Sequence, residues 1–289
     1  MKSAPWAWLI GLVLLFFAGD RLGGWGLKRM TDSSQFRYAR LYQDKAVSDI
    51  LLLGNSRGLC FFQPEIEAIT GKNTFNLSYN GLPINVANAL ALDYFDRYPA
   101  PELLLIDVTL CDRVNKQVLS EFVLYAPYSK RLQELLQQER PQHYQAAQWM
   151  HLFRYNNELF QRTLFYLNDS DEDWLLDRVI STTMKSNVAE QTYSIDTFLV
   201  NELVALTEKA REKGIKVNLL INPYYPSFLE TMKGLNEFEQ QIETATGLEV
   251  HNYANALQEA SYFGDYQHLN KIGSQAYLKL LFQDGLLTK

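Results

Sequence analysis

The sequence lacks several features that define common functional classes. Only two cysteines occur among 289 residues, too few for a disulfide framework. There is no metal-ligand cluster, phosphate-binding loop or dinucleotide-binding fingerprint, so neither a metal nor a cofactor is implied. The formal net charge is −6, the pI is near 5.3 and no basic stripe occurs. These properties argue against a nucleic-acid-binding protein.

The longest uncharged run lies near the N-terminus. Residues 3–19 are seventeen uncharged residues and include Trp6 and Trp8. Seventeen residues is the short end of what spans a bilayer as a helix, and tryptophan near one end fits an interfacial belt. A cleavable signal peptide is the alternative, but cleavage after Ala18 would place Phe16 where a small residue is needed. We therefore expect an uncleaved transmembrane signal anchor.

The rest of the chain alternates between short apolar runs and helical patterns. Strands are expected at residues 49–53, 74–77, 103–108, 217–221 and 249–252. Helices are expected at residues 34–47, 59–70, 86–97, 195–213, 228–245 and 271–282. This alternation predicts an α/β fold, a three-layer α/β/α sandwich of the flavodoxin-like kind with a roughly five-stranded parallel sheet.

One long segment interrupts the alternation. Residues 114–190 contain helical stretches at 129–138 and 143–167, and we interpret the segment as a helical insertion after the third strand. Such insertions tend to lie over a site as a lid or a partner surface. The expected organisation is a signal anchor and linker over residues 1–33, followed by one domain over residues 34–289.

A serine and an Asp-x-x-His turn are the main candidates for chemistry. The tetrapeptide Gly-Asn-Ser-Arg at residues 54–57 follows the first predicted strand, at the sheet edge where open α/β sheets build their sites. A helix N-cap is the structural alternative for Ser56. Asp265 lies three residues before His268. Because a nucleophilic serine needs a base and the base needs an orienting acid, the sequence predicts a Ser56–His268–Asp265 triad.

Several other polar and aromatic residues near these motifs have either two interpretations, one functional and one structural, or a structural interpretation alone. Arg57 could bind a substrate carboxylate or phosphate, or form a structural salt bridge. Tyr224 and Tyr225 could line a cleft for sugar stacking, or pack within their loop. Asn55 is expected to tie the serine turn, and Asn270 to cap the last helix.

The two cysteines follow neighbouring predicted strands. Cys60 lies after the first strand and Cys111 after the third, so both fall near one sheet edge. Either a single disulfide forms in an oxidising compartment, or the two are unrelated buried thiols.

The serine segment and the Asp-x-x-His turn resemble the first and last motif blocks of the SGNH (GDSL-like) hydrolase superfamily. The Asn-Ser-Arg variant at residues 55–57 and the N-terminal anchor resemble its membrane-tethered branch. That branch includes alginate-type polysaccharide O-acetylation proteins and the teichoic-acid D-alanylation protein. The resemblance spans about residues 48–285.

The resemblance implies an SGNH-type O-acyltransferase or O-acyl esterase that acts on acyl groups, acetyl above all, of an envelope or exported polysaccharide. It also implies an acyl donor, a glycan acceptor and a multi-spanning membrane acyltransferase as partners. The chain would be a single-pass protein of the cytoplasmic membrane, with its catalytic domain in the periplasm or outside.

The same resemblance suggests the oxyanion donors. The backbone N–H of Ser56 is one, and Gly81 matches the glycine of the second block, although it could be an ordinary turn glycine. The family's third donor is an asparagine that residues 107–112 lack, so Thr109 substitutes or the hole has two donors. The missing asparagine supports an alternative function, a non-catalytic SGNH-like scaffold that binds polymer or assembles an acylation complex.

Overall fold

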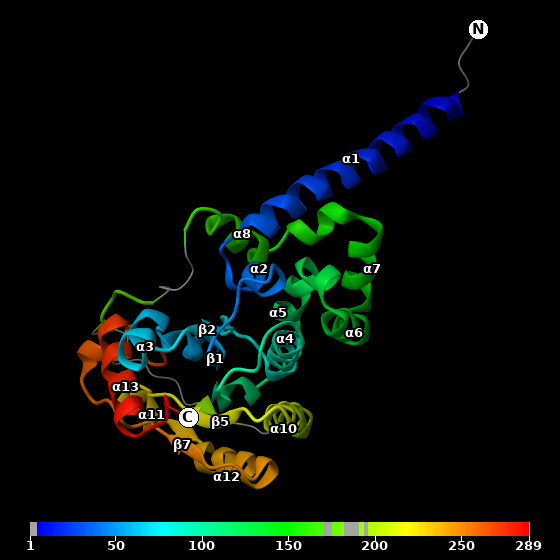
Figure 1. The fold of residues 1–289 in the computed structure, drawn as a ribbon. Coiled ribbons are helices and arrows are strands. Elements are labelled where there is room, and N and C mark those ends of the chain that lie inside the picture. Colours follow the sequence, from blue (N-terminus) through cyan, green and yellow to red (C-terminus); the bar gives the residue numbers. More distant parts are fainter. Residues whose placement is uncertain (1–4, 170–174, 182–190, 194–195, 289) are drawn as a thin grey trace. The chain divides into compact units, whose positions relative to one another are not determined.

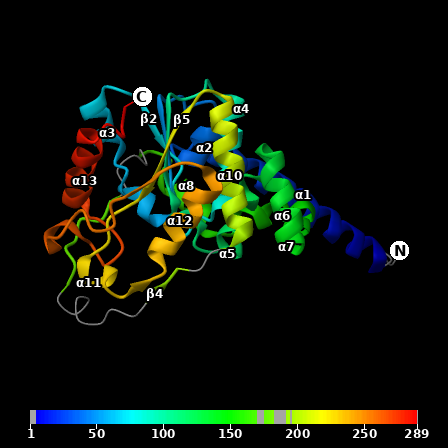
Figure 2. The same ribbon diagram turned by 90° about the horizontal axis from the view of Figure 1, so that it is seen from below.

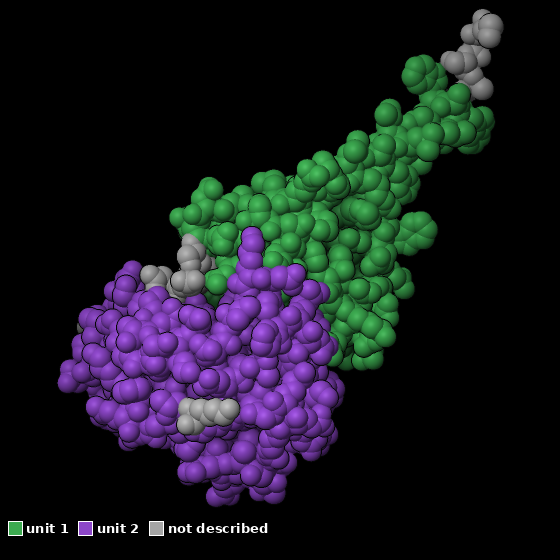
Figure 3. Space-filling view, viewed as in Figure 1, with its two compact units in different colours: residues 1–43, 116–170 green, residues 44–115, 171–289 purple. Residues whose placement is uncertain are grey.

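The computed structural model describes residues 5–169, 175–181, 191–193 and 196–288. The chain divides into two compact units, coloured separately in Figure 3. Unit 1 comprises Met1–Gln43 and Lys116–Ser170, and unit 2 comprises Asp44–Asn115 and Asp171–Lys289. Each unit is described by itself below.

Unit 2 is built on a five-stranded sheet. Its strands are β1 (Ile50–Leu53), β2 (Thr74–Asn76), β3 (Leu103–Asp107), β5 (Lys216–Ile221) and β7 (Val250–Asn252). They lie in the order β2-β1-β3-β5-β7, and all neighbouring pairs are parallel. The predicted five-stranded parallel α/β sheet is therefore confirmed.

The central strands are aliphatic because both faces of the sheet are covered. Every residue of β1 and β3 is buried. A parallel sheet of this kind has helices on both faces, so its strands appear in the sequence as continuous apolar runs rather than alternating ones. This is why the runs at residues 50–53 and 103–106 were recognisable in the sequence.

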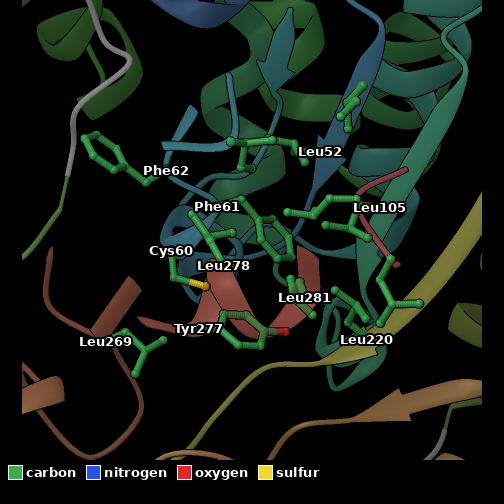
Figure 4. Close-up of a cluster of buried hydrophobic side chains, with 14 of the residues drawn as sticks. Leu52, Cys60, Phe61, Phe62, Leu105, Leu220, Leu269, Tyr277, Leu278 and Leu281 are labelled. Carbon is green, nitrogen blue, oxygen red and sulfur yellow. The ribbon is translucent and has the colours of Figure 1, made fainter. Parts of the chain in front are cut away.

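Helices form the two outer layers of unit 2, as Figure 2 shows. The layer on one face contains α4 (Ile84–Arg97), α10 (Thr197–Glu212) and α12 (Leu235–Thr246). The opposite layer contains α3 (Gln63–Thr70) and α13 (Lys271–Gln283). The core beneath α3 and α13 joins strand residues such as Leu52 and Leu105 to Phe61, Tyr277 and Leu278 (Figure 4).

Some predicted elements are divided by turns. The expected helix at residues 59–70 is a 3₁₀ turn, η1 (Ser56–Cys60), followed by α3. The expected helix at 228–245 is instead α11 (Pro226–Leu229), a strand β6 (Met232–Lys233) and α12. Gly234 has a φ of 78°, a left-handed conformation that ends one element before α12 begins. Strand β6 pairs in parallel with β4 (Gln191–Thr192) in a second, two-stranded sheet.

Further short 3₁₀ turns connect the main elements. In unit 2 they are η2 (Val108–Cys111) and η6 (Ala260–Tyr262). In unit 1 they are η3 (Phe122–Leu124), η4 (Ala126–Tyr128) and η5 (His151–Tyr155).

Unit 1 begins with one long helix, α1 (Pro5–Ser33), shown in blue in Figure 1. By length and composition this helix can cross a membrane. It continues through residues 20–33, a stretch with three glycines that was expected to form the linker after the anchor. A Cβ on Gly24 would lie 2.7 Å from Cβ of His151, so the glycine permits close packing of η5 against α1.

The remaining helices of unit 1 come from residues 37–42 and from the insertion. They are α2 (Arg37–Tyr42), α5 (Lys116–Glu121), α6 (Lys130–Glu139), α7 (Pro141–Trp149) and α8 (Glu158–Phe165). The helix expected at 143–167 is therefore interrupted by η5, and Asn157 caps α8 by accepting from the N–H of Phe160. Residues 170–174 and 182–190 of the predicted insertion lie outside the described residues.

An aromatic cluster joins α2 to the insertion within unit 1. The ring of Tyr38 packs edge-on against Phe122 and Tyr125, and Phe36 stacks on Tyr166. Aromatic pairs of this geometry contribute about 0.5–1.5 kcal/mol each beyond their buried area. The insertion and the segment after α1 therefore share one core.

Both cysteines are buried free thiols. Burial raises the pKa of the Cys60 and Cys111 thiols above the usual range of a thiol. The interpretation as two separate buried thiols therefore holds in this structure.

The turn after β1 leaves no room for a side chain at Gly54. A Cβ there would lie 2.5 Å from Cα of Gly58, which is backbone and cannot rotate away. We expect Gly54→Ala to lower the free energy of unfolding by about 1–3 kcal/mol, as overpacking does. Chemical unfolding of the full-length protein in detergent measures this.

The matched control is Gly247→Asn. Gly247 has a positive φ, but no atom lies within 4 Å of a Cβ at this position, and asparagine tolerates the left-handed conformation. A loss at Gly54 no greater than at Gly247 would contradict the close approach of the two glycines.

Candidate active site

Strand β1 ends at a turn that presents Ser56. The side chain of Asn55 accepts a hydrogen bond from the N–H of Arg57 and donates to both the carbonyl and the hydroxyl oxygen of Thr109, each at 3.1 Å. The N–H of Gly58 also donates to the carbonyl of Asn55. Asn55 thus ties the turn to the segment after β3, and Ser56 is held at the carboxyl edge of the sheet.

The structure brings Ser56, His268 and Asp265 together. Nε2 of His268 lies 2.8 Å from Oγ of Ser56, and Nδ1 of His268 lies 2.8 Å from Oδ1 of Asp265. The same Oδ1 accepts the backbone N–H of Gln267 and of His268, at 2.9 and 3.0 Å. The aspartate therefore fixes the turn as well as the orientation of the imidazole.

The environment of Asp265 favours its ionised form. Burial raises its pKa, but hydrogen bonds from the His268 ring and from the N–H groups of Gln267 and His268 outweigh burial, and the net pKa is lowered. Nη2 of Arg178 lies 3.5 Å from Oδ2. An ionised Asp265 keeps the proton of the neutral imidazole on Nδ1, which leaves Nε2 as an acceptor toward Ser56.

Asn270 follows this turn and caps α13. Its side chain accepts the N–H of Gly273 and donates to the carbonyl of Ser261 at 2.7 Å. The cap role that the sequence predicted is confirmed, and it fixes the start of α13 at Lys271, three residues after His268.

Arg57 lies in a buried polar network behind the serine. Its Nε is 3.6 Å from Oδ2 of Asp107, the last residue of β3, and its guanidinium lies 3.3 Å from the ring centre of Tyr224. It also donates to the carbonyl of Gln267 at 2.9 Å and to the carbonyl of Asn222. The salt-bridge alternative for Arg57 therefore describes its contacts better than substrate binding does.

Asp107 and Asn222 are site residues to which the sequence reasoning gave no role. Asn222 donates to Oδ2 of Asp107 at 2.6 Å, and Tyr277 donates to Oδ1 of Asn222 at 2.7 Å. Burial raises the pKa of Asp107, an effect that the Arg57 guanidinium opposes. Burial lowers the pKa of Arg57, but electrostatic interactions with Tyr224 and Asp107 outweigh burial, and the net pKa is raised. Both could have been recognised in the sequence, because each is a polar residue at or directly after the end of a buried strand, where open α/β sheets build their sites.

Of the predicted oxyanion donors, Thr109 is not available. Its N–H and its hydroxyl both donate to Oδ1 of Asp107, at 3.0 and 2.7 Å, and the residue is fully buried. Thr109 therefore supports Asn55 and Asp107. Gly81 has a φ of 65° and lines the same cavities as Ser56, and its role as an oxyanion donor stays a prediction.

The aromatic residues after β5 do not offer open faces for sugar stacking. Tyr224 is buried under the guanidinium of Arg57, and its hydroxyl bonds that of Tyr193. Burial raises the pKa of Tyr224 to about 12. Tyr225 packs edge-on against Phe263 in the core. Loop packing, the other interpretation of these tyrosines, is what the structure shows.

Two cavities in unit 2 meet at the serine. The first, about 380 Å³, is lined by His268 and Asp265 and by leucines that include Leu176 and Leu269. The second, about 290 Å³, is lined by polar groups that include Asp112, Arg113 and Tyr193. Ser56, Arg57 and Gly81 border both. Leu175, Leu176 and Arg178 of the expected insertion also line the first cavity, as the expectation that the insertion lies over a site implies.

Within the described ranges, no three His, Cys, Asp or Glu side chains form a group that could hold a metal ion.

No protein-family model matches the chain, and no curated protein matches it. A solved structure from Streptococcus pneumonia, provisionally described as a platelet activating factor, is 14% identical with a TM-score of 0.44 and covers 97% of this chain and 99% of its own. A protein from Bacteroides fragilis, provisionally described as an acylhydrolase, is 11% identical with a TM-score of 0.38, over 84% and 89% of the two chains. A GDSL-like lipase from Bacteroides thetaiotaomicron is 12% identical with a TM-score of 0.39, over 88% and 99%. All three TM-scores lie below 0.5.

We expect Arg57→Met to be strongly destabilising. It leaves the fully buried carboxylate of Asp107 without its counter-charge, which typically costs about 3–5 kcal/mol. Because Arg57 also donates to Gln267, the turn that carries His268 should become less ordered. Urea unfolding of the full-length protein measures the free-energy loss.

Two variants control this prediction. Arg113→Met removes an arginine whose side chain is 73% exposed, 3.8 Å from Asp112, and should cost at most about 1 kcal/mol. Adding Asp107→Asn to Arg57→Met removes the unpaired charge and should recover part of the stability. Equal losses in the single and the double variant would show that the charge on Asp107 is not the cause.

The lowered pKa of Asp265 predicts a pH-dependent contribution to stability. A carboxyl group whose pKa is lower in the folded than in the unfolded chain stabilises the fold above its unfolded pKa, and this contribution disappears as the pH falls through the folded pKa. Asp265→Asn should therefore lower the free energy of unfolding at pH 7 and have progressively less effect below about pH 4. Unfolding curves between pH 7 and pH 3 test this, and a constant difference between the two proteins would contradict it.

Proposed function

We propose that the protein is an SGNH-type serine acyl-transfer enzyme with Ser56, His268 and Asp265 as its catalytic triad. The observation that carries the proposal is the continuous hydrogen-bonded chain from Ser56 Oγ through His268 to Asp265, open to two cavities. A structural N-cap serine would not require a histidine at 2.8 Å that is itself oriented by a carboxylate.

In the first half of the reaction, His268 Nε2 takes the proton of Ser56 Oγ as the oxygen attacks the acyl carbonyl. The tetrahedral intermediate collapses to an acyl-serine, and His268 gives its proton to the departing group. Asp265 stays ionised throughout and stabilises the imidazolium that forms transiently. In the second half His268 activates the hydroxyl group that attacks the acyl-serine and releases Ser56.

The oxyanion of each tetrahedral intermediate needs donors that are already in place. The proposed donors are the backbone N–H groups of Ser56 and Gly81. Each such donor contributes about 100- to 1,000-fold to the rate in serine enzymes. With Thr109 committed to Asp107, a hole of two backbone donors is the arrangement that this chain supports.

The proposed acyl group is acetyl, and the proposed acceptor is a hydroxyl group of an envelope or exported polysaccharide, or water in an esterase reaction. Two cavities that share Ser56 give separate space to an acyl group and an acceptor, which supports transfer. The resemblance of residues 54–57 and of the anchor to membrane-tethered SGNH proteins supports this substrate class, a periplasmic domain and a multi-spanning membrane acyltransferase as partner.

A second candidate function is a non-catalytic scaffold that binds polymer or assembles an acylation complex. The specific observation in its favour is that the segment after β3 has no asparagine and that its threonine donates inward. The triad geometry argues for catalysis, so the two functions differ in whether Ser56 reacts.

The decisive experiment treats the full-length protein in detergent with a fluorophosphonate probe and with p-nitrophenyl acetate. We expect labelling and hydrolysis in the wild type, and neither in Ser56→Ala or His268→Ala. The double variant should be no worse than either single one, because one missing member already disables the nucleophile. Asp265→Asn should reduce the rate by roughly 100- to 10,000-fold.

Ser261→Ala is the control, because Ser261 is an exposed serine near the same turn. It should react like the wild type. Labelling that persists in Ser56→Ala would show that another residue is the nucleophile, and an unreactive wild type that is folded by circular dichroism would favour the scaffold.

A further inference from the structure

The turn after α7 is attached to the middle of α1 within unit 1. The carboxylate of Asp20 accepts the N–H groups of His151 and Leu152, at 2.8 and 2.9 Å. Gly23 and Gly24 allow the side chains of Leu152 and His151 to approach the helix closely. The depth of this turn along α1 is therefore fixed at the level of residues 20–24.

The charges at this level are compensated inside the protein. Asp20 is only 3% exposed, and Nη1 of Arg21 lies 2.6 Å from its carboxylate and donates to the carbonyl of Trp149 at 3.2 Å. A paired and hydrogen-bonded charge is far less costly near lipid than an isolated one, and a long arginine side chain can direct its head toward water. Asp20 and Arg21 consequently do not require the lipid boundary to lie before residue 20.

Large exposed apolar side chains lie near residues 20–24, both on α1 and on the turn at residues 149–152. Leu22 and Trp25 of α1 are 70% and 56% exposed, and Trp149, at the end of α7, is 71% exposed. Met150 and Leu152 are also exposed apolar residues of the same turn. Tryptophan is enriched where membrane proteins cross the membrane–water interface, so this set of side chains is typical of such an interface.

The length of α1 points to the same boundary. The uncharged stretch at residues 3–19 would reach about 26 Å as a helix, short of the hydrocarbon thickness of about 30 Å. From Pro5 to Trp25 the helix reaches about 31 Å. Figure 1 shows that the N-terminal half of α1 extends beyond the other helices of unit 1, so only its later half contacts them.

We propose that the bilayer crossed by α1 reaches the level of Trp25, and that the turn at residues 149–152 lies in the lipid headgroup region there. Trp149 and Met150 enter the interface, and Arg21 reaches the headgroups beside them. The occupant of this apolar surface is the lipid itself, because the surface is continuous with the lipid-facing side of α1. The proposal rests on the membrane anchoring proposed above and is independent of the catalytic triad.

The test uses the full-length protein in vesicles of phosphatidylcholine and phosphatidylglycerol with doxyl groups near the headgroups. Single cysteines carry an environment-sensitive fluorophore in a background with both buried cysteines replaced by alanine. Trp149→Cys is the test site. Phe165→Cys is the matched control, because Phe165 is 70% exposed in the same unit. It belongs to α8, whose Thr163 carbonyl accepts a hydrogen bond from the hydroxyl of Ser34, directly after the C-terminal end of α1. Leu12→Cys reports whether α1 is in the membrane.

We expect strong quenching and a blue-shifted emission at position 149, at least three-fold more quenching than at position 165, and a blue shift at position 12. Quenching at 149 no greater than at 165, with position 12 in lipid, would overturn the proposal and leave the anchor intact. Absence of a lipid signal at position 12 would overturn both. Trp149 is largely exposed, so its replacement should not prevent folding, which circular dichroism checks.

Discussion

The buried ion pair between Arg57 and Asp107 is the interaction on which the arrangement of the site depends. Asp107 ends β3, and Arg57 follows the serine at the end of β1. The same arginine donates to the carbonyl of Asn222 after β5 and to that of Gln267, next to the histidine. One buried charge therefore ties three neighbouring strand ends to the turn that holds His268. Since such a pair has no water to replace a lost partner, its geometry tolerates little change.

Most of the fold of unit 2 could be predicted because the strands of a parallel sheet are recognisable in the sequence. Strands buried on both faces are continuous aliphatic runs, as at residues 50–53 and 103–106, and this signal depends on no distant residue. The interruptions of predicted helices, such as the one expected at residues 228–245, were missed because they depend on the local backbone conformation, for example the left-handed conformation of Gly234. The helical course of the glycine-rich stretch in α1 could not be foreseen, because it depends on packing against residues 151 and 152, far along the chain.

The candidate site was predictable where a residue type implies its partner. A nucleophilic serine needs a base, and that base needs an acid to orient it, so the serine turn and the Asp-x-x-His turn predict one another. The structure places Ser56, Asp265 and His268 in contact. Thr109 was considered as an oxyanion donor, and Tyr224 either as a wall for sugar stacking or as a loop-packing residue, because the sequence does not show which way a side chain points. Both point inward, to Asp107 and to Arg57, and of these two partners the sequence reasoning gave no role to Asp107.

The site also has a temporal consequence. Ser56 and His268 hydrogen-bond although 212 positions separate them along the chain, and His268 lies between the last strand of the sheet and the last helix. During synthesis the serine emerges early, but its base follows only after nearly all of the sheet has left the ribosome. Contacts of such long range also form late in folding, because the loop between them must first close. Under the proposed mechanism, Ser56 therefore remains an ordinary alcohol while the chain is incomplete.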